Sequence, residues 1–217
     1  MNLELPFLTA VLLGSLHAFE ADHLAAVTSF AVQKPTPRQS VGFGFRWALG
    51  HGTSILLAGL LLIFLGLKIP EGATLIMERS VGAVLIALGI WTMLATRAMH
   101  AHEHVHQGSR HLHLHSHLLG RGHDHRHAPT LVGLMHGLAG AAPAVALVPL
   151  AMFDSAFGGI SYLLLFAIGT AVSMSVYALF AGYIAGRATR IAASFGRAVG
   201  QLTGLSTIVI GFIWLIR

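Results

Sequence analysis

Long apolar stretches, separated by short polar segments, recur along this chain. They cover approximately residues 6–30, 41–67, 75–99, 130–152, 160–185 and 198–216. Each is close to the roughly 20 apolar residues that an α-helix needs to cross a bilayer. The pattern predicts an all-α, polytopic membrane protein with six transmembrane helices. No small-residue cleavage site follows the first stretch, so we expect a retained helix rather than a removed signal peptide.

Three short segments of the first half reappear, in the same order, in the second half. The pairs are Gly14-Ser-Leu-His17 with Gly133-Leu-Met-His136 and Trp47-Ala-Leu-Gly50 with Phe166-Ala-Ile-Gly169, both 119 residues apart, and Arg79-Ser-Val-Gly82 with Arg197-Ala-Val-Gly200, 118 apart. Each half would hold three helices, an odd number, so the halves must have opposite orientations. Such inverted repeats are a transporter architecture, with the site at the membrane midplane.

The repeat divides the chain into three parts. Residues 1–99 are the first three-helix half, 100–129 are a loop, and 130–217 are the second three-helix half. Ten of the thirteen basic residues follow the first, third and fifth predicted helices: Lys34, Arg38, Arg46, Arg97, Arg110, Arg121, Arg126, Arg187, Arg190 and Arg197. Because cytoplasmic loops carry the basic excess, we expect a multi-pass protein of the cell (inner) membrane. Both termini would face outward and the central loop would be cytoplasmic.

Composition narrows the functional classes. Hydrophobic residues make up 55% of the chain and charged residues 10%, whereas about a quarter of a soluble domain is charged. The chain has no cysteine, which excludes disulfides, thiolate metal sites and thiol–disulfide electron transfer. The net charge of +5 does not indicate nucleic-acid binding, because membrane orientation explains the basic loops better.

The first predicted helix carries an unusual polar cluster, His17-Ala-Phe-Glu20-Ala-Asp22-His23. A charged group near the bilayer centre costs about 2.5–3.5 kcal/mol on insertion scales, so such groups usually mark an ion site or pathway. The alternative is a polar contact that only holds helices together. Histidine with carboxylate suits a borderline divalent cation such as Ni²⁺, Co²⁺ or Zn²⁺, and we favour that interpretation.

Two further histidines lie at a comparable depth in other predicted helices, namely His51 and His136. The predicted metal ligands are therefore His17, Glu20, Asp22, His23, His51 and His136. In a regular helix of 3.6 residues per turn, Asp22 points about 140° away from His17. Either the helix is distorted near Ala21, or Asp22 orients another ligand.

The central loop is rich in histidines, most of which alternate with other residues. They are His100, His102, His104, His106, His111, His113, His115, His117, His123, His125 and His127. Such tracts are typical of metal binding. We expect an accessory cytoplasmic segment that collects or buffers metal and is disordered without it; the alternative is a solvated linker. His102-Glu103-His104-Val105-His106 matches H-E-x-x-H, but a zinc protease needs that motif on a helix in a formed site.

The motifs resemble a known family. His17-x4-Asp22-His23 resembles the intramembrane motif of the nickel/cobalt transporter (NiCoT/NicO) superfamily, with Glu20 where an aspartate is usual. Gly50-His51-Gly52-Thr53-Ser54 is similar to its next motif. Met135-His-Gly-Leu-Ala-Gly140 resembles the short six-span branch that includes urease-accessory nickel permeases. The chain has fewer spans than the eight-span members and no acidic counterpart in its fourth and fifth predicted helices. The resemblance implies transport of Ni²⁺ or Co²⁺.

The sequence thus favours a divalent-metal permease rather than an enzyme, with Ni²⁺ or Co²⁺ as substrate and no prosthetic group. The alternatives are an exporter of zinc or another divalent metal and a membrane metal-storage or sensor protein. Expected partners are the metal cation and the lipid bilayer, without nucleic acid. A cytoplasmic metallochaperone, urease or hydrogenase maturation factors, and a second copy of the chain are further candidates.

Overall fold

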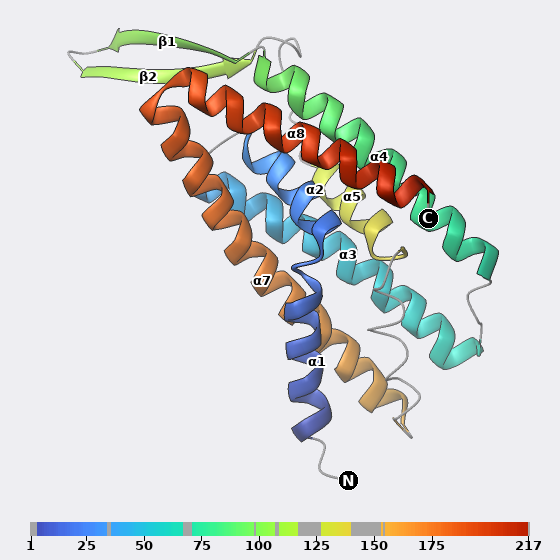
Figure 1. The fold of residues 1–217 in the computed structure, drawn as a ribbon. Coiled ribbons are helices and arrows are strands. Elements are labelled where there is room, and N and C mark those ends of the chain that lie inside the picture. Colours follow the sequence, from blue (N-terminus) through green and yellow to red (C-terminus); the bar gives the residue numbers. More distant parts are fainter. Residues whose placement is uncertain are drawn as a thin grey trace.

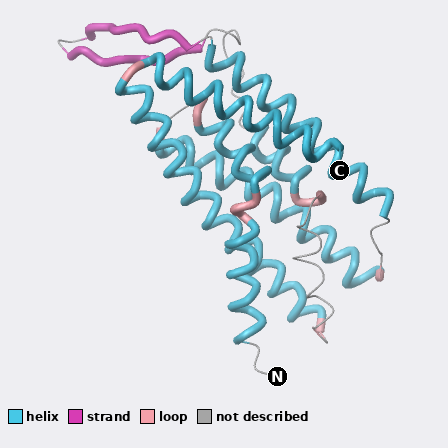
Figure 2. The backbone as a smooth tube through the Cα atoms, viewed as in Figure 1, coloured by secondary structure: helices cyan, strands magenta, loops and turns pink. Residues whose placement is uncertain are grey.

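A computed structural model describes residues 4–33, 36–66, 71–97, 99–106, 109–116, 127–139, 153 and 155–216. A helical bundle carries a two-stranded antiparallel sheet at one end, and both termini lie away from that sheet (Figure 1; Figure 2). The elements are α1 (Glu4–His17), α2 (Ala21–Ala31), α3 (Pro37–Leu65), α4 (Glu71–Arg97), β1 (Met99–His106), β2 (Ser109–Ser116), α5 (Ala128–His136), α7 (Ala156–Ile191) and α8 (Ala193–Ile216).

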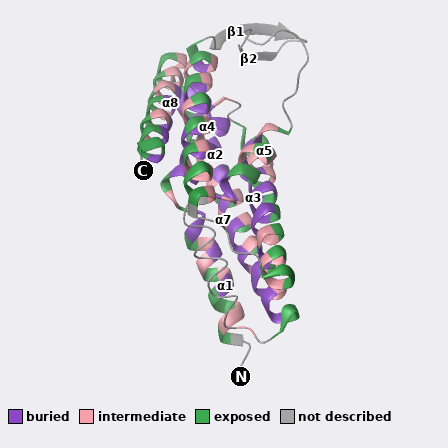
Figure 3. Cartoon of the chain, turned by 90° about the vertical axis from the view of Figure 1, so that its right-hand side faces the viewer, coloured by how far each residue is buried: buried purple, intermediate pink, exposed green. Residues whose placement is uncertain are grey.

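Within the described residues, four helices are long and apolar enough to cross a bilayer: α3, α4 from Leu75 onward, α7 and α8. Large apolar side chains remain exposed on these helices, among them Leu57, Phe180 and Ile213. Exposed positions, green in Figure 3, recur along the outer sides of the helices. A soluble domain would bury more of this surface, whereas lipid stabilises it. The chain is therefore a multi-pass membrane protein, and its membrane-spanning part is helical.

The first predicted helix, expected to be continuous over residues 6–30, is broken. Helix α1 ends at His17 and α2 begins at Ala21. The connecting turn is tight, since the amides of Phe19 and Glu20 donate to the carbonyls of Leu16 and His17 at 3.0 and 3.1 Å. The expectation of a distortion near Ala21 is confirmed, although the break contains neither glycine nor proline.

The structure describes the fourth predicted helix, over residues 130–152, only in its first part. Helix α5 ends at His136, and residues 137–139 form a turn. Residues 140–152 lie outside the described part of the chain. Only α1, α2 and α5 fall short of the length of a full span among the described helices.

The structure describes a β-hairpin in the central loop, where the sequence analysis expected a segment that is disordered without metal. Strands β1 and β2 pair in antiparallel register from Met99 opposite Ser116 to His106 opposite Ser109. The alternating pattern of this segment is compatible with an extended ladder, in which successive residues face opposite sides. The segment thus has a defined backbone register.

Two close helix contacts have the same form. Helix α1 packs on α7, and a Cβ on Gly14 would meet the carbonyl oxygen of Phe166. Helix α5 packs on α3, and a Cβ on Gly133 would meet the carbonyl oxygen of Trp47. Gly133 follows Gly14 by 119 residues, and Phe166 follows Trp47 by the same interval. The α1–α7 contact is thus reproduced, with the halves exchanged, by α5 and α3.

Helices α4 and α8 also meet through glycines. A Cβ on Gly82 would lie 2.7 Å from the carbonyl oxygen of Gly211, and one on Gly204 would lie 2.8 Å from that of Gly89. Gly204 and Gly82 therefore have matching surroundings, since each faces the carbonyl oxygen of a glycine on the partner helix. Gly200, the predicted counterpart of Gly82, instead faces the side chain of Thr96. The predicted alignment of this third pair is wrong by one helical turn, because a short apolar match carries little register information.

Candidate metal centre

The break in the first helix brings several half-helix ends together in the middle of the bundle. Helix α1 ends at His17 and α5 ends at His136, so each places a histidine in its last turn. The C-terminal end of a helix carries a partial negative charge that favours a cation. His51 comes from the interior of α3, beside these ends. The C-terminal ends of α1 and α5 therefore favour a cation, and the N-terminal end of α2 at the same break favours the carboxylate of Asp22.

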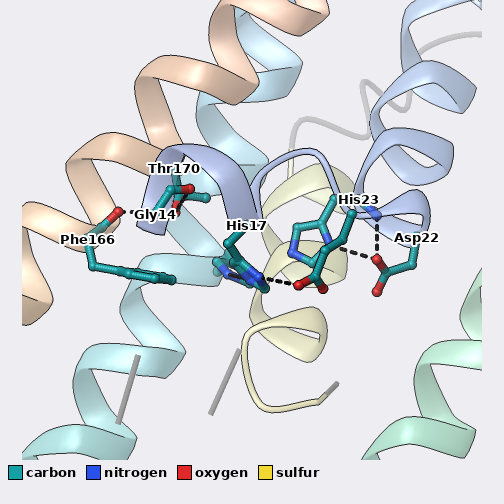
Figure 4. A network of polar contacts seen from close by, with 8 residues as sticks. Gly14, His17, Asp22, His23, Phe166 and Thr170 are labelled. Atoms are coloured by element: carbon teal, nitrogen blue, oxygen red, sulfur yellow. Dashed lines mark hydrogen bonds and ion pairs between the residues drawn. The ribbon is translucent and has the colours of Figure 1, made fainter. Parts of the chain in front are cut away.

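The first turn of α2 supplies a buried carboxylate. Asp22 is 4% exposed, and its Oδ1 accepts both the backbone N–H of His23 at 2.9 Å and the His23 ring nitrogen Nδ1 at 2.8 Å (Figure 4). Since a carboxylate oxygen accepts, Nδ1 of His23 carries the proton. Neutral His23 therefore has its lone pair on Nε2. Asp22 thus acts on His23 as an orienting carboxylate acts on a histidine that binds a metal.

Two of the other three histidines, His17 and His136, are also held through Nδ1. Nδ1 of His17 donates to Oε1 of Glu20 at 2.8 Å, and Nε2 of His17 lies 3.2 Å from Nε2 of His51. Nδ1 of His136 donates to the carbonyl oxygen of Val132 at 2.9 Å. With its proton on Nδ1, neutral His136 has its lone pair on Nε2. Neutral His17 also has its lone pair on Nε2, where it accepts from Nε2–H of His51.

Several buried ring nitrogens have no hydrogen-bond partner among the residues that the structure describes. They are Nε2 of His23, Nδ1 of His51, Nε2 of His136 and Nε1 of Trp47. A buried polar atom left without a partner costs about 1–3 kcal/mol. A cation would offset this cost at the imidazoles, because it accepts lone pairs that no donor reaches.

The spacing of these atoms suits a first-row metal ion. One ligand atom each from His17, His23 and His51 lies within 4.8 Å of the others, and the same holds for Glu20, Asp22 and His23. At a metal–nitrogen distance of about 2.1 Å, neighbouring ligand nitrogens lie about 3.0–3.4 Å apart. The 3.2 Å between the Nε2 atoms of His17 and His51 falls in this range, so only His23 would have to approach.

Two aromatic rings wall the centre, and the sequence analysis did not predict them as part of it. Trp47 is fully buried, stacks on His51 at 4.9 Å between ring centroids and meets His23 edge-on at 4.7 Å. Phe166 lies 5.6 Å from His17. The sequence did contain a signal for both rings. Trp47 precedes His51 by four residues and so shares its helix face, and Phe166 is the repeat counterpart of Trp47. These rings keep water from the imidazoles and fix their planes.

The predicted ligands fall into three groups. His17, Asp22, His23 and His51 are buried together, with Glu20 partly exposed beside them. His136 is buried next to His23, at 5.7 Å between ring centroids, but it is in neither of the two closest ligand groups. Of the loop histidines, His100, His102, His104, His106, His111, His113 and His115 lie on the hairpin and His127 precedes α5, whereas His117, His123 and His125 lie outside the described residues.

Comparison with known proteins places the chain in a family. The family model for the transmembrane region of cytochrome C biogenesis protein matches residues 7–213. The chain belongs to this family. A relative, urease accessory protein UreH from Bacillus sp. (strain TB-90), is 30% identical over 202 residues, covering 92% of this chain and 85% of its own. The Arabidopsis thaliana chloroplast protein FOR GROWTH AND FERTILITY 2 is 28% identical over 176 residues, covering 80% and 46%. No solved structure matches.

These relationships agree with part of the sequence analysis. The expected kinship with urease-accessory membrane proteins is confirmed by the UreH relative. The matching family model is that of cytochrome C biogenesis rather than that of the nickel/cobalt transporters. Because the sequence contains no cysteine, this member of the family has no thiol with which to exchange disulfides. Its buried chemistry consists of imidazole and carboxylate groups.

Proposed function

We propose that this protein carries Ni²⁺ or Co²⁺ across the membrane through the histidine centre between α1, α2, α3 and α5. The observation that carries the proposal is a set of buried imidazoles from four helices. Three of them have Nδ1 held by an acceptor, and one ligand atom each from His17, His23 and His51 lies within 4.8 Å of the others. Nitrogen and oxygen donors without sulfur favour Ni²⁺, Co²⁺ or Zn²⁺ and offer little to Cu(I). His17, His23 and His51 would be the principal ligands. Asp22 and Glu20 would orient them, and His136 would be a further ligand on the path.

The transport architecture that fits this centre is a pair of inverted three-helix halves with six spans. The exchanged contacts of Gly14 with Phe166 and of Gly133 with Trp47 support this arrangement. The broken α1–α2 segment and the short α5 would be the discontinuous helices of the two halves. Transporters with inverted repeats place such helix ends at the midplane, around the ion.

The hairpin of β1 and β2 is proposed to collect metal on the cytoplasmic side. Its register sets His100, His102 and His104 directly opposite His115, His113 and His111. Residues directly opposite in an antiparallel ladder share a face, with Cβ atoms about 4.5–5.5 Å apart. The backbone register therefore pairs three histidines of β1 with three of β2 in succession, and we propose that these pairs bind metal.

The relationship to a urease accessory protein supports nickel as the first substrate to test. On the same basis, urease maturation factors or a cytoplasmic metallochaperone are the proposed partners. A zinc exporter and a metal-storage or sensor protein remain the competing functions. They differ from the proposal in the metal that moves and in whether any metal crosses the membrane.

Cellular metal content separates these functions. Cells with and without the gene would be grown in nickel, cobalt or zinc and analysed for each element. We expect the gene to change nickel or cobalt content, and we expect His17→Ala, Asp22→Ala and His23→Ala to abolish the change while the protein still inserts. Gly42→Ala is the control, because a Cβ at Gly42 meets nothing within 4 Å and the residue is not a predicted ligand. A change confined to zinc, or normal transport by two of the three variants, would overturn the assignment.

A further inference from the structure

Helix α2 carries a polar stripe that leads away from the histidine centre. Asp22, Ala26, Ser29 and Gln33 follow one another at intervals of four, three and four residues. This spacing keeps them on one face from the start of α2 to just beyond its end. Asp22, Ala26 and Ser29 are buried. The stripe begins at the carboxylate that holds His23 and runs toward the hairpin end of the bundle (Figure 1).

Polar side chains of α4 and α8 face this stripe. The hydroxyl of Ser29 lies 3.0 Å from that of Thr207 on α8, and Nε2 of Gln33 donates to the hydroxyl oxygen of Thr92 on α4 at 3.2 Å. Thr92 and Thr207 are fully buried, as is Ser29. The interface of α2, α4 and α8 is therefore polar at two successive levels.

The row continues to the surface. Nε2 of Gln201 donates to the hydroxyl oxygen of Thr96 at 2.7 Å. Nε of Arg97 donates to Oε1 of Gln201 at 3.3 Å, at an exposed position two residues before β1 begins. From Asp22 to Gln33 the rise is about 16 Å at 1.5 Å per residue. This is about half of a 30 Å hydrocarbon core, the distance from the midplane to the membrane surface.

The threonines of the row present lone pairs rather than protons. The hydroxyl of Thr92 donates to the carbonyl oxygen of Leu88, and that of Thr207 donates to the carbonyl oxygen of Thr203, both at 2.8 Å. Because these protons are used within their own helices, the oxygens can only accept at the interface, and Ser29 must be the donor to Thr207. Helix adhesion would be served equally by donors, whereas a cation needs acceptors.

The opposite side of the centre differs. Around α1, the buried neighbours form an apolar cluster that includes Ala10, Ile55, Leu163 and Phe166. Within the part of the chain described by the structure, the buried hydroxyls on this side, such as those of Ser54 and Thr170, donate to backbone carbonyls. The α2–α4–α8 side instead pairs polar side chains with one another.

We infer that the α2–α4–α8 interface is the path along which a divalent cation passes between the histidine centre and the hairpin end of the bundle. Hydroxyl and amide oxygens would replace part of its hydration shell at each level. This inference rests on the proposed transport function and adds to it the route and the side to which the centre opens. The pairs seen here close the path, and their separation would open it.

Cysteine labelling tests the path independently of transport, because the natural chain has no cysteine that would have to be removed. Thr207→Cys would be compared with Thr170→Cys in reconstituted membranes, using a membrane-impermeant cationic thiol reagent. Thr170 is also fully buried and also donates to a carbonyl four residues earlier, but it contacts Gly14 of α1, on the opposite side of the centre. Arg97→Cys marks the hairpin side.

We expect Thr207→Cys to react at least about tenfold faster than Thr170→Cys, since modification follows the population of the open path. The reaction should occur only from the side that labels Arg97→Cys, and saturating Ni²⁺ should slow it. Equal rates for the two cysteines, or labelling of Thr207→Cys from the other side, would overturn the inference.

A second measurement separates a path from a structural contact. The double variant Ser29→Ala/Thr207→Val should lower Ni²⁺ flux at least about tenfold, because removing oxygen ligands from a route raises the cost of a desolvated ion. Ni²⁺ binding at equilibrium should stay unchanged, and Thr207→Ser should retain flux. Unchanged flux, or loss of binding together with flux, would count against the path. If the wild type carries no flux, the proposed function fails, while the labelling result still decides the path.

Discussion

Replacing Asp22 by asparagine tests whether the buried carboxylate tunes the centre. The amide side chain would keep an oxygen able to accept from the backbone and from the ring of His23, as Oδ1 does now at 2.9 and 2.8 Å. Only the negative charge and one acceptor oxygen would be lost. Changes to a group that orients a metal ligand typically weaken metal affinity about 10- to 100-fold, which corresponds to roughly 1.4–2.8 kcal/mol.

The fold should tolerate this change better than the metal site does. Asp22 is 4% exposed, and a neutral amide is cheaper to bury than a carboxylate. We therefore expect the thermal unfolding of the metal-free Asp22→Asn protein in detergent to resemble that of the wild type. Its Ni²⁺ affinity, measured by isothermal titration calorimetry, should fall by the amount given above.

Glu20→Gln is the matched control. Glu20 also holds a histidine through Nδ1 at 2.8 Å, but its side chain is 31% exposed. Water screens an exposed charge, so the same substitution should weaken Ni²⁺ binding less than about tenfold. Ni²⁺ binding that is lost in His23→Ala is assigned to the buried site. Ni²⁺ binding that remains in this variant is assigned to the hairpin. If Asp22→Asn bound Ni²⁺ as tightly as the wild type, or if Glu20→Gln had the larger effect, the reasoning from burial would be refuted.

Three further predictions follow from the packing, the ligands and the hairpin. Gly50→Ala should destabilise the protein by about 1–3 kcal/mol, because its Cβ would meet the backbone of Thr130 and Leu134, whereas Gly42→Ala has nothing within 4 Å and should unfold at the wild-type temperature. Protons compete with metal at each imidazole, so Ni²⁺ binding should weaken as the pH falls; a pH-independent affinity would argue against histidine ligands. Replacing the hairpin histidines with asparagine should raise the metal concentration needed for half-maximal transport more than it lowers the maximal rate; complete loss of transport, with the protein still in the membrane, would place the hairpin in the pathway.

The sequence predicted the long helices because their length and apolarity are local properties. It also predicted that His17, His23, His51 and His136 come together. Polar side chains within membrane spans face the interior of the bundle, and histidines at similar depths therefore meet there. The break after His17 was foreseen only as one of two alternatives. No glycine or proline marks it, and its turn is accompanied by side-chain contacts such as those of His17 with Glu20 and of Asp22 with His23.

Other features depended on tertiary contacts that composition does not encode. The place of Trp47 against His23 depends on how α2 packs on α3. The matching of Gly82 with Gly204, rather than with Gly200, depends on the register between α4 and α8. Apolar helices resemble one another closely enough that a shift of one turn leaves the sequence pattern almost unchanged.

The most direct test of the account is Ni²⁺ flux into proteoliposomes that contain the purified protein and an enclosed metal-sensitive dye. Wild type and the Gly42→Ala control should give equal, saturable flux of Ni²⁺ or Co²⁺. His23→Ala should give none, because it removes the imidazole shared by both of the closest ligand groups. Absence of flux from the wild type, or undiminished flux through His23→Ala, would contradict the claim that the histidine centre carries the metal.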